Sequence, residues 1–286
     1  MKVHQLLVKG YEILKAENID SYIIDCQLIL AKVLKLDRLS IILNKEKEVE
    51  EDKLYEFLKL VDLRKEKMPL KYITEEAEFM GIPFYIKEGV LIPRPDTEIL
   101  TEEALRYIDA SELKLICDVC CGSGVIGLSI AKLRENIQVY CADISEVSEE
   151  ITEKNIELLE LQHKVTFTKS DLLEFAIEKK MIFDMIVSNP PYIKEEVIPT
   201  LMEDVKLYEP YIALCGGEDG LDFYRQITKQ SSSLLKEGGV LGFEIGYDQA
   251  KEVTDILMKN NFSNIKVVKD LAGLDRVVIG TKCEAP

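Results

Sequence analysis

The stretch F-D-M-I-V-S-N-P-P-Y-I, residues 183–193, determines how the rest of the chain folds. Its apolar run Met185–Val187 contains β-branched members, which is typical of a strand buried on both faces. The run stops before Pro190, because proline has no N–H to donate to a sheet ladder. We therefore predict a buried strand over Phe183–Ser188, with Asn189 held extended just beyond its C-terminal end.

The residues after this strand carry groups that suit a planar –NH₂ substrate. The Asn189 carboxamide oxygen and the Pro190 carbonyl oxygen could each accept one N–H of such a group. The two bonds would direct the nitrogen lone pair, and orientation is a large part of catalysis when the nucleophile is poor. Tyr192 could stack on the flat group. The position also fits, since open α/β sheets bind ligands at the carboxyl ends of their strands.

Strands and helices alternate along the chain around this segment. The predicted strands are residues 113–120, 138–143, 164–170, 183–188, 240–245, 264–269 and 276–281. The predicted helices are residues 125–134, 147–161, 172–179, 221–236 and 247–260. Gly238–Gly239 is the predicted C-cap of helix 221–236. Strict alternation predicts a parallel sheet with right-handed crossovers. A short link joins the last two strands, so we expect one of them to be antiparallel.

A candidate cofactor site lies at the ends of the first three of these strands. The loop after the first strand has glycines that let its backbone approach a ligand, and it consists of Cys120, Cys121, Gly122, Ser123 and Gly124. Asp143 ends the second strand, where a carboxylate can bind both hydroxyls of a ribose. At the end of the third strand, Asp171 could accept from an adenine amino group and Leu172 could cover the adenine face.

Loop and acid together fit any nucleoside cofactor, including NAD, FAD and S-adenosyl-L-methionine. The absence of a third loop glycine disfavours a dinucleotide. In this arrangement three strand ends hold a nucleoside, and a fourth strand end beside them holds an –NH₂ group. Such a site suits the transfer of a methyl group from a sulfonium to nitrogen. We expect no histidine base in such a reaction, because the product can lose its proton after transfer.

Composition limits the compartment and the metal chemistry. The chain has 286 residues and is 47% apolar, yet no apolar run approaches the ~18 residues of a membrane span. Seven cysteines without a secretory signal indicate free thiols and a cytoplasmic protein. Cys117 and Cys120 have metal-ligand spacing, but His4 and His163 are the only histidines, so we expect no metal site.

The charge is distributed unevenly along the chain. Residues 1–74 contain 14 Lys+Arg and 13 Asp+Glu, a balance of +1, which leaves 22 and 39, or −17, for the remainder. Nucleic-acid binders usually present a basic face. The acidic excess therefore counts against a nucleic-acid substrate.

Three domains are predicted from the change in pattern along the chain. Residues 1–74 carry helical apolar stripes and form a small helical domain. Residues 75–93 alternate around two glycines and are expected to be a β-hairpin linker. Residues 94–286 form the catalytic domain and open with a helix start in which Asp96 or Thr97 can be the N-cap.

Several motifs together resemble the HemK/PrmC family of class I, Rossmann-like S-adenosyl-L-methionine-dependent methyltransferases. They are Pro69-x-x-Tyr72-Ile73, Glu78-Phe79-x-Gly81, Leu91-Ile92-Pro93-Arg94-Pro95-Asp96-Thr97-Glu98, the glycine loop, Asn189-Pro190-Pro191-Tyr192, Tyr208-Glu209-Pro210, Gly216-Gly217-x-Asp219-Gly220-Leu221 and Asp275-Arg276. Members methylate the glutamine of the Gly-Gly-Gln loop in peptide chain release factors. The resemblance spans nearly the whole chain, and its R-P-D-T-E and G-G-x-D-G-L segments are the most particular.

The resemblance implies roles for residues at matching positions. Cys120 to Gly124 and Asp143 would hold S-adenosyl-L-methionine, and Leu172 would lie against its adenine. Asn189 would contact both cofactor and substrate, while Pro190, Pro191 and Tyr192 frame the glutamine. The helical domain would help to grip the release factor, and we expect a monomer. One departure is Cys120, which stands where the family often has the first loop glycine.

Two other readings stay open on sequence grounds. N-P-P-Y is shared with adenine-N6 methyltransferases that act on DNA or RNA, although the acidic C-terminal part and the lack of an obvious target-recognition domain disfavour this. A non-enzymatic nucleoside-binding regulator is the other alternative, but it would not need N-P-P-Y beside a cofactor loop.

Overall fold

A computed structural model describes residues 1–284, and the chain divides into two compact units. The helical unit comprises Met1–Glu76 together with Met202–Tyr208. The sheet unit comprises Ala77–Leu201 and the chain from Glu209 onward. Within residues 1–284, no helix is both long and apolar enough to cross a membrane.

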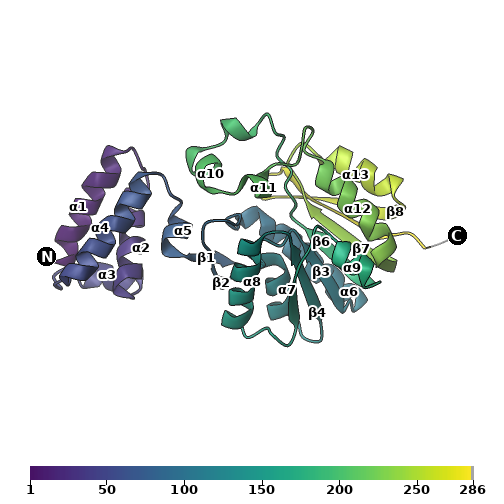
Figure 1. The fold of residues 1–286 in the computed structure, drawn as a ribbon, viewed down its shortest axis with the longest axis horizontal. Helices are drawn as coiled ribbons and strands as arrows, with labels where there is room; N and C mark the ends of the chain where they lie inside the picture. The colour runs from purple at the N-terminus through teal and green to yellow at the C-terminus, as the bar shows by residue number, and fades with distance from the viewer. Residues whose placement is uncertain (285–286) are drawn as a thin grey trace. The chain divides into compact units, whose positions relative to one another are not determined.

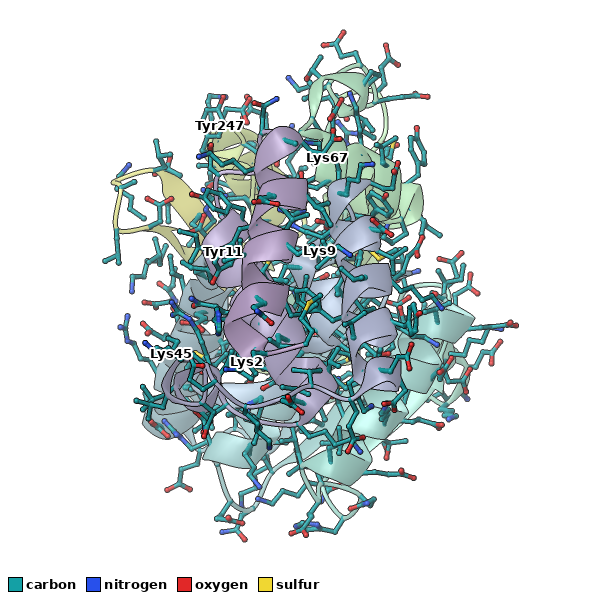
Figure 2. The ribbon with its side chains drawn as sticks, turned by 90° about the vertical axis from the view of Figure 1, so that its left-hand side faces the viewer. Lys2, Lys9, Tyr11, Lys45, Lys67 and Tyr247 are labelled. Carbon is teal, nitrogen blue, oxygen red and sulfur yellow. The ribbon has the colours of Figure 1, made fainter. Side chains whose placement is uncertain are left out.

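The helical unit is a small bundle with its own core. Its helices are α1 (Val3–Ala16), α2 (Tyr22–Leu34), α3 (Arg38–Leu43), α4 (Glu51–Lys65), α5 (Leu70–Thr74) and α10 (Glu203–Tyr208). Helices α1, α2 and α4 pack closely around Gly10, which has no side chain. A Cβ added there would lie only 2.9 Å from both Cys26 Sγ and Phe57 Cζ. Polar side chains such as the exposed Lys9 project from the other side of α1 (Figure 2). The predicted N-terminal helical domain is therefore confirmed.

The sheet unit is built on a large mixed sheet (Figure 1). Its strands are β3 (Leu115–Val119), β4 (Gln138–Asp143), β5 (Val165–Lys169), β6 (Phe183–Ser188), β7 (Leu235–Glu244), β8 (Phe262–Lys269) and β9 (Asp275–Lys282). Over residues 1–284 the strand order is β5-β4-β3-β6-β7-β9-β8. Strand β9 is antiparallel to both neighbours, whereas the strands from β5 to β7 are parallel. The predicted parallel sheet and the predicted antiparallel strand near its end are both confirmed.

Strand β6 occupies the middle of this sheet, as its sequence requires. All six residues of Phe183–Ser188 are buried, and the strand pairs with β3 on one side and β7 on the other. Burial of a large aliphatic side chain stabilises a fold by roughly 1.5–3 kcal/mol, so an unbroken apolar run favours this central position. Both β4 and β6 have the limits that the sequence predicts.

Helices cover both faces of the sheet. They are α6 (Glu98–Ser111), α7 (Val125–Leu133), α8 (Glu146–Leu158), α9 (Glu174–Glu178), α12 (Asp222–Leu234) and α13 (Ala250–Lys259). On one face, a Cβ at Gly242 of β7 would lie 3.2 Å from Leu100 of α6. On the other face, the adjacent residue Phe243 packs edge-on against Tyr224 of α12. Because adjacent strand residues point to opposite faces, α6 and α12 lie on opposite sides of the sheet.

Two local predictions are corrected by the structure. Gly238–Gly239 does not cap α12, which ends at Leu234, but lies inside β7. The pairing of β6 with β7 shifts between Phe183 and Met185, and the positive φ of Gly238 (+70°) belongs to that irregularity. The alternating pattern of residues 75–93 produces strands only in its first part, β1 (Glu76–Phe79) and β2 (Ile82–Tyr85).

The region between β6 and α12 contains several short helices. It contains the short helices η2 (Ile198–Thr200) and α11 (Tyr211–Leu214) in addition to α10. A second short 3-10 helix, η1 (Pro95–Thr97), leads directly into α6.

Candidate active site

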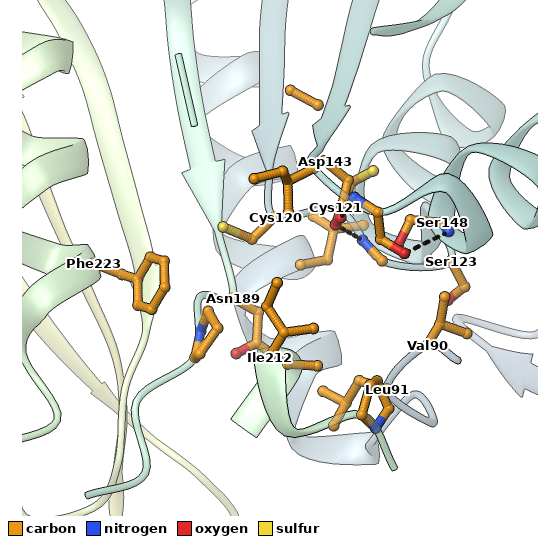
Figure 3. A pocket seen from close by; sticks show the side chains of 18 of the residues that line it. Val90, Leu91, Cys120, Cys121, Ser123, Asp143, Ser148, Asn189, Ile212 and Phe223 are labelled. Atoms are coloured by element: carbon orange, nitrogen blue, oxygen red, sulfur yellow. Dashed lines mark hydrogen bonds between the residues drawn. The ribbon is translucent and has the colours of Figure 1, made fainter. Parts of the chain in front are cut away.

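A cavity of about 360 Å³ lies where the parallel strands β3 to β6 end. This volume is within the usual range for small-molecule sites. Nine residues that the sequence predicts for the site line it, namely Cys120, Cys121, Gly122, Ser123, Asp143, Asp171, Leu172, Asn189 and Pro191. Figure 3 shows Cys120, Asp143 and Asn189 arranged around this space. Three other predicted residues, Gly124, Pro190 and Tyr192, are not among the lining residues of the described chain.

The glycine loop bends sharply between β3 and α7. Cys120, Gly122 and Gly124 have φ values of +58°, +56° and +79°, which only glycine adopts without strain. A Cβ at Gly122 would meet nothing within 4 Å, so this glycine leaves room on the cavity side. Gly124 has a packing role instead, because a Cβ there would lie 2.9 Å from Leu128.

Asp143 joins the glycine loop to the following turn. Its Oδ2 accepts from the Gly122 amide at 2.9 Å, and its Oδ1 accepts from the Ser145 amide at 2.9 Å. Ser145 then caps α8 by accepting from the amides of Val147 and Ser148. A carboxylate has about four acceptor sites, so Asp143 keeps capacity for hydroxyl donors in the cavity.

Asn189 is oriented by a residue from the start of α6. Its Nδ2 donates to Thr97 Oγ1 at 3.3 Å, which directs the carboxamide oxygen toward other donors. Thr97 was predicted as a possible N-cap and does stand at that position, but its side chain makes no capping bond. Thr97 is buried and lines the cavity, and its hydroxyl accepts from Asn189 instead of capping the helix.

Tyr192 lies behind the cavity wall and is held at both ends. Its hydroxyl bonds Glu244 Oε1 at 3.3 Å, and its carbonyl accepts from Gln249 Nε2 at 3.0 Å. Burial, with the charge of Glu244, raises the pKa of the Tyr192 phenol. Backbone from the Gly216–Gly220 segment also packs here, since a Cβ at Gly220 would lie 2.4 Å from the Tyr192 carbonyl oxygen.

Neither thiol reactivity nor metal binding explains the cysteines near the loop. Burial raises the pKa of the Cys120 and Cys121 thiols, so both stay protonated. Residues 1–284 contain no group of three or more His, Cys, Asp or Glu side chains arranged to hold a metal ion.

The R-P-D-T-E segment fastens several elements around the site. Arg94 forms an ion pair with the buried Glu209, which precedes α11. Glu98 Oε1 accepts from the Met80 amide in the β1–β2 turn at 2.6 Å. These contacts are structural, and they place α6, the hairpin and the segment before α11 in fixed positions within the sheet unit.

Comparison with known proteins identifies the family. The model of the PrmC N-terminal domain matches residues 5–74, and that of the methyltransferase small domain matches residues 97–205. A release factor glutamine methyltransferase of Clostridium acetobutylicum is 50% identical over 99% of this chain and 99% of its own length. The enzyme of the same name from Clostridium botulinum is 52% identical over 99% of this chain and 100% of its own. This chain belongs to the release factor glutamine methyltransferase family.

Membership of this family confirms the resemblance seen in the motifs and makes S-adenosyl-L-methionine the cofactor. A solved 16S rRNA methyltransferase of T. thermophilus, in complex with AdoMet and guanosine, has the same fold. It superposes with a TM-score of 0.51 at 18% identity, over 72% of this chain and 49% of its own. The predicted class I methyltransferase fold is therefore confirmed.

Other lining residues of this family member were missed by the sequence reasoning. Nine of them come from the segment after the hairpin, from the region around α11 and from α12: Gly89, Val90, Leu91, Pro93, Pro210, Ile212, Ala213, Phe223 and Gln226. Figure 3 shows Val90 and Phe223 on different sides of the space. The alternating apolar pattern around Val90 predicted a strand. Phe223 lies in a predicted helix, and the helical apolar pattern does not indicate that its side chain lines a cavity.

Proposed function

We propose that this chain transfers a methyl group from S-adenosyl-L-methionine to the side-chain amide nitrogen of the glutamine in the Gly-Gly-Gln loop of peptide chain release factors. The observation that carries the proposal is one cavity lined by the glycine loop, Asp143 and Asn189 in a chain of this family. In this proposal the one cavity holds both the nucleoside of the donor and the –NH₂ group of the acceptor.

The residues present fit the cofactor. Asp143 keeps acceptor capacity for the two ribose hydroxyls, and the open side of Gly122 admits the rest of the donor. Asp171 is exposed beside the buried Leu172, which suits one polar and one apolar contact with adenine. When bound, S-adenosyl-L-methionine supplies an electrophilic methyl group on a sulfonium.

The chain's own residues orient the acceptor amide. Because the Asn189 nitrogen donates to Thr97, the Asn189 oxygen remains as an acceptor for one N–H of the glutamine. The Pro190 carbonyl would accept the other N–H, and Pro191 forms part of the cavity wall beside it. These two bonds would turn the nitrogen lone pair toward a methyl donor held in the cavity, and one of the two amide protons would be lost to water after transfer.

The finer assignments belong to the same proposal. We infer that the release factor, not nucleic acid, is the partner, since residues 75–286 carry a balance of −17. We also infer that the helical domain, residues 1–74, helps to hold the release factor, that the chain acts as a monomer, and that it acts in the cytoplasm, where release factors work on ribosomes.

The direct test is to incubate the purified chain with methyl-labelled donor and either release factor, DNA or tRNA. Label should appear in release factor and map to the Gly-Gly-Gln peptide. It should be absent from a release factor whose loop glutamine is replaced by alanine. Label in adenine instead would support an adenine-N6 methyltransferase. Label in neither release factor nor nucleic acid would support a protein that binds the donor and transfers no methyl group.

A further inference from the structure

A buried carboxyl group stands beside the proposed acceptor site. Glu244 ends β7 and is 2% exposed. The register pairs Ser188 of β6 with Phe243 of β7, so the next residues, Asn189 and Glu244, leave neighbouring strands at the same edge. Burying a carboxylate costs several kcal/mol unless it is well bonded, and an apolar side chain would suit the core better here.

Glu244 is bonded to Tyr192 and lies beside Thr97, the residue to which Asn189 donates. The Tyr192 hydroxyl donates to Glu244 Oε1 at 3.3 Å, Glu244 Oε2 has no hydrogen-bond partner among the described residues, and Thr97 lies near enough as a donor to lower the pKa of Glu244. Thr97 Oγ1 also accepts from Asn189 Nδ2. An ionised Glu244 can only accept, so a Thr97 hydroxyl turned toward it would donate to Glu244 while it accepts from Asn189.

We propose that Glu244 is a positioning residue for methyl transfer, which fixes the Tyr192 ring through its hydroxyl and, through Thr97, the direction of the Asn189 carboxamide. The inference rests on the proposed function. If Thr97 donates to Glu244, its oxygen can only accept from Asn189, and the Asn189 oxygen must then face the substrate. Without this acceptor the Thr97 hydroxyl can turn, and the carboxamide loses its preferred orientation.

The charges around Glu244 place its ionisation near neutral pH. Burial raises the pKa of Glu244 to about 7. The hydrogen bond from Thr97, the charge of Arg276 on β9 and the bond from Tyr192 lower it, while Asp96 on η1 raises it further. The acceptor form of Glu244 is therefore present above pH 7 and is lost as the pH falls below it.

The backbone of the same turn is held independently. Gln249 Nε2 donates to the carbonyls of Tyr192 and Gly220, at 3.0 and 3.2 Å. Its Oε1 accepts from the Gly246 amide and lies 3.3 Å from the hydroxyl of Tyr224, whose single proton it shares with the Glu244 carbonyl at 3.0 Å. A side-chain change at Glu244 should thus disturb the Tyr192 ring and the Asn189 carboxamide while leaving the turn in place.

Three variants of the full-length chain test the inference. Glu244→Leu removes both acceptor oxygens, whereas Glu244→Gln keeps one but cannot ionise. The matched control is Glu103→Gln, because Glu103 is also a buried carboxyl, 1% exposed, but lies on α6 and pairs with Arg106 and Lys266. Steady-state transfer to release factor, donor affinity by calorimetry and the pH profile of kcat are measured for each.

We expect Glu244→Leu to lower kcat about 10- to 100-fold, the usual effect of misplacing catalytic groups by an ångström. Its donor Kd should stay within about threefold, since the ribose and adenine contacts are elsewhere. Wild-type kcat should rise with pH through about 7. Glu244→Gln should lose that step, and Glu103→Gln should keep both the step and the wild-type kcat. Tyr192→Phe should make Glu244→Leu less costly, because the two act through one bond.

The outcomes separate this inference from the proposed function. A wild-type chain that labels no release factor refutes the proposed function. Normal kcat and an unchanged pH step in both Glu244 variants refute the positioning role. A crystal structure of Glu244→Leu decides the matter without turnover: the Tyr192 ring or the Asn189 carboxamide should be displaced, and unchanged positions of both would overturn the inference.

Discussion

Asn189 is bonded through its nitrogen, and this asymmetry defines its role. Because Nδ2 is directed at Thr97, the carboxamide oxygen is the atom left for the substrate. We expect Asn189→Ala to lower kcat by about 1,000-fold, as for the loss of a group that orients or stabilises the reacting atoms. Donor Kd, measured by calorimetry, should change by less than about threefold.

Asn189→Asp is the control for shape, since it keeps an acceptor oxygen in the same place. Its activity should lie between those of the wild type and Asn189→Ala. Transfer at the wild-type rate by Asn189→Ala would remove the carboxamide from the mechanism.

Asp143 should govern donor affinity, because its carboxylate faces the cavity and also holds the Gly122 and Ser145 amides. Hydrogen bonds to a charged group contribute roughly 1.5–3 kcal/mol, so Asp143→Ala should raise donor Kd by about 10- to 100-fold. Glu146→Ala is the matched control, an exposed acid nearby whose partner is Lys169. Equal affinity of Asp143→Ala and wild type would exclude the ribose role.

At the scale of elements, the sequence predicted strands better than the walls of the cavity. The apolar run of β6 stops just before Pro190 and Pro191, which cannot donate to a sheet ladder, so the limits of this strand agree with the prediction. Residues 86–93 share the alternating pattern but pair with no strand of the described chain, and several line the cavity instead. Pairing partners lie far away in sequence, which is why pattern alone could not separate these cases.

The candidate site was predictable only where its chemistry is carried by a motif. The glycine loop, Asp143 and Asn189 each stand at a strand end, and parallel strands bring such ends together. Glu244 and Gln249 carry no local signal, because the Tyr192 contact that ties each of them to the site spans more than 50 residues of the chain. Thr97 gave a misleading signal, since a threonine at a helix start is usually a cap.

The glycine segment between α11 and α12 supports the N-P-P-Y turn by close backbone contact. A Cβ at Gly220, which has φ +76°, would lie 2.4 Å from the Tyr192 carbonyl oxygen. We expect Gly220→Ala to lower kcat by more than about 10-fold, because the N-P-P-Y turn must move to make room for the alanine side chain. Transfer to release factor at saturating donor is the measurement.

Gly273→Ala is the control, since Gly273 has a similar φ of +81° but a Cβ there would meet nothing within 4 Å. Both variants carry the cost of a left-handed residue, roughly 1 kcal/mol of stability. The Gly220 variant alone should lose activity. Equal activity of the two variants would show that the contact with Tyr192 is unimportant.

For the whole molecule, burial of acids should make stability fall as the pH rises toward neutral. Asp118 of β3 is fully buried and accepts from the Gly127 amide at 2.8 Å. Burial raises its pKa from 3.8 to about 7, with a further contribution from Asp143 and an opposing one from the Gly127 bond. The folded state therefore binds a proton that the unfolded state has released between about pH 4 and pH 7.

Asp118→Asn keeps an acceptor for the Gly127 amide and cannot ionise. Its stability relative to wild type should therefore improve by about 1.4 kcal/mol per pH unit up to pH 7, or about 2 kcal/mol between pH 5.5 and 7.5. Exposed acids with lowered pKa, such as Asp109 and Asp219, lose their stabilising effect only at lower pH and are common to both proteins. Urea unfolding without donor at several pH values is the measurement, and parallel stability curves would mean that Asp118 is ionised in the folded chain throughout.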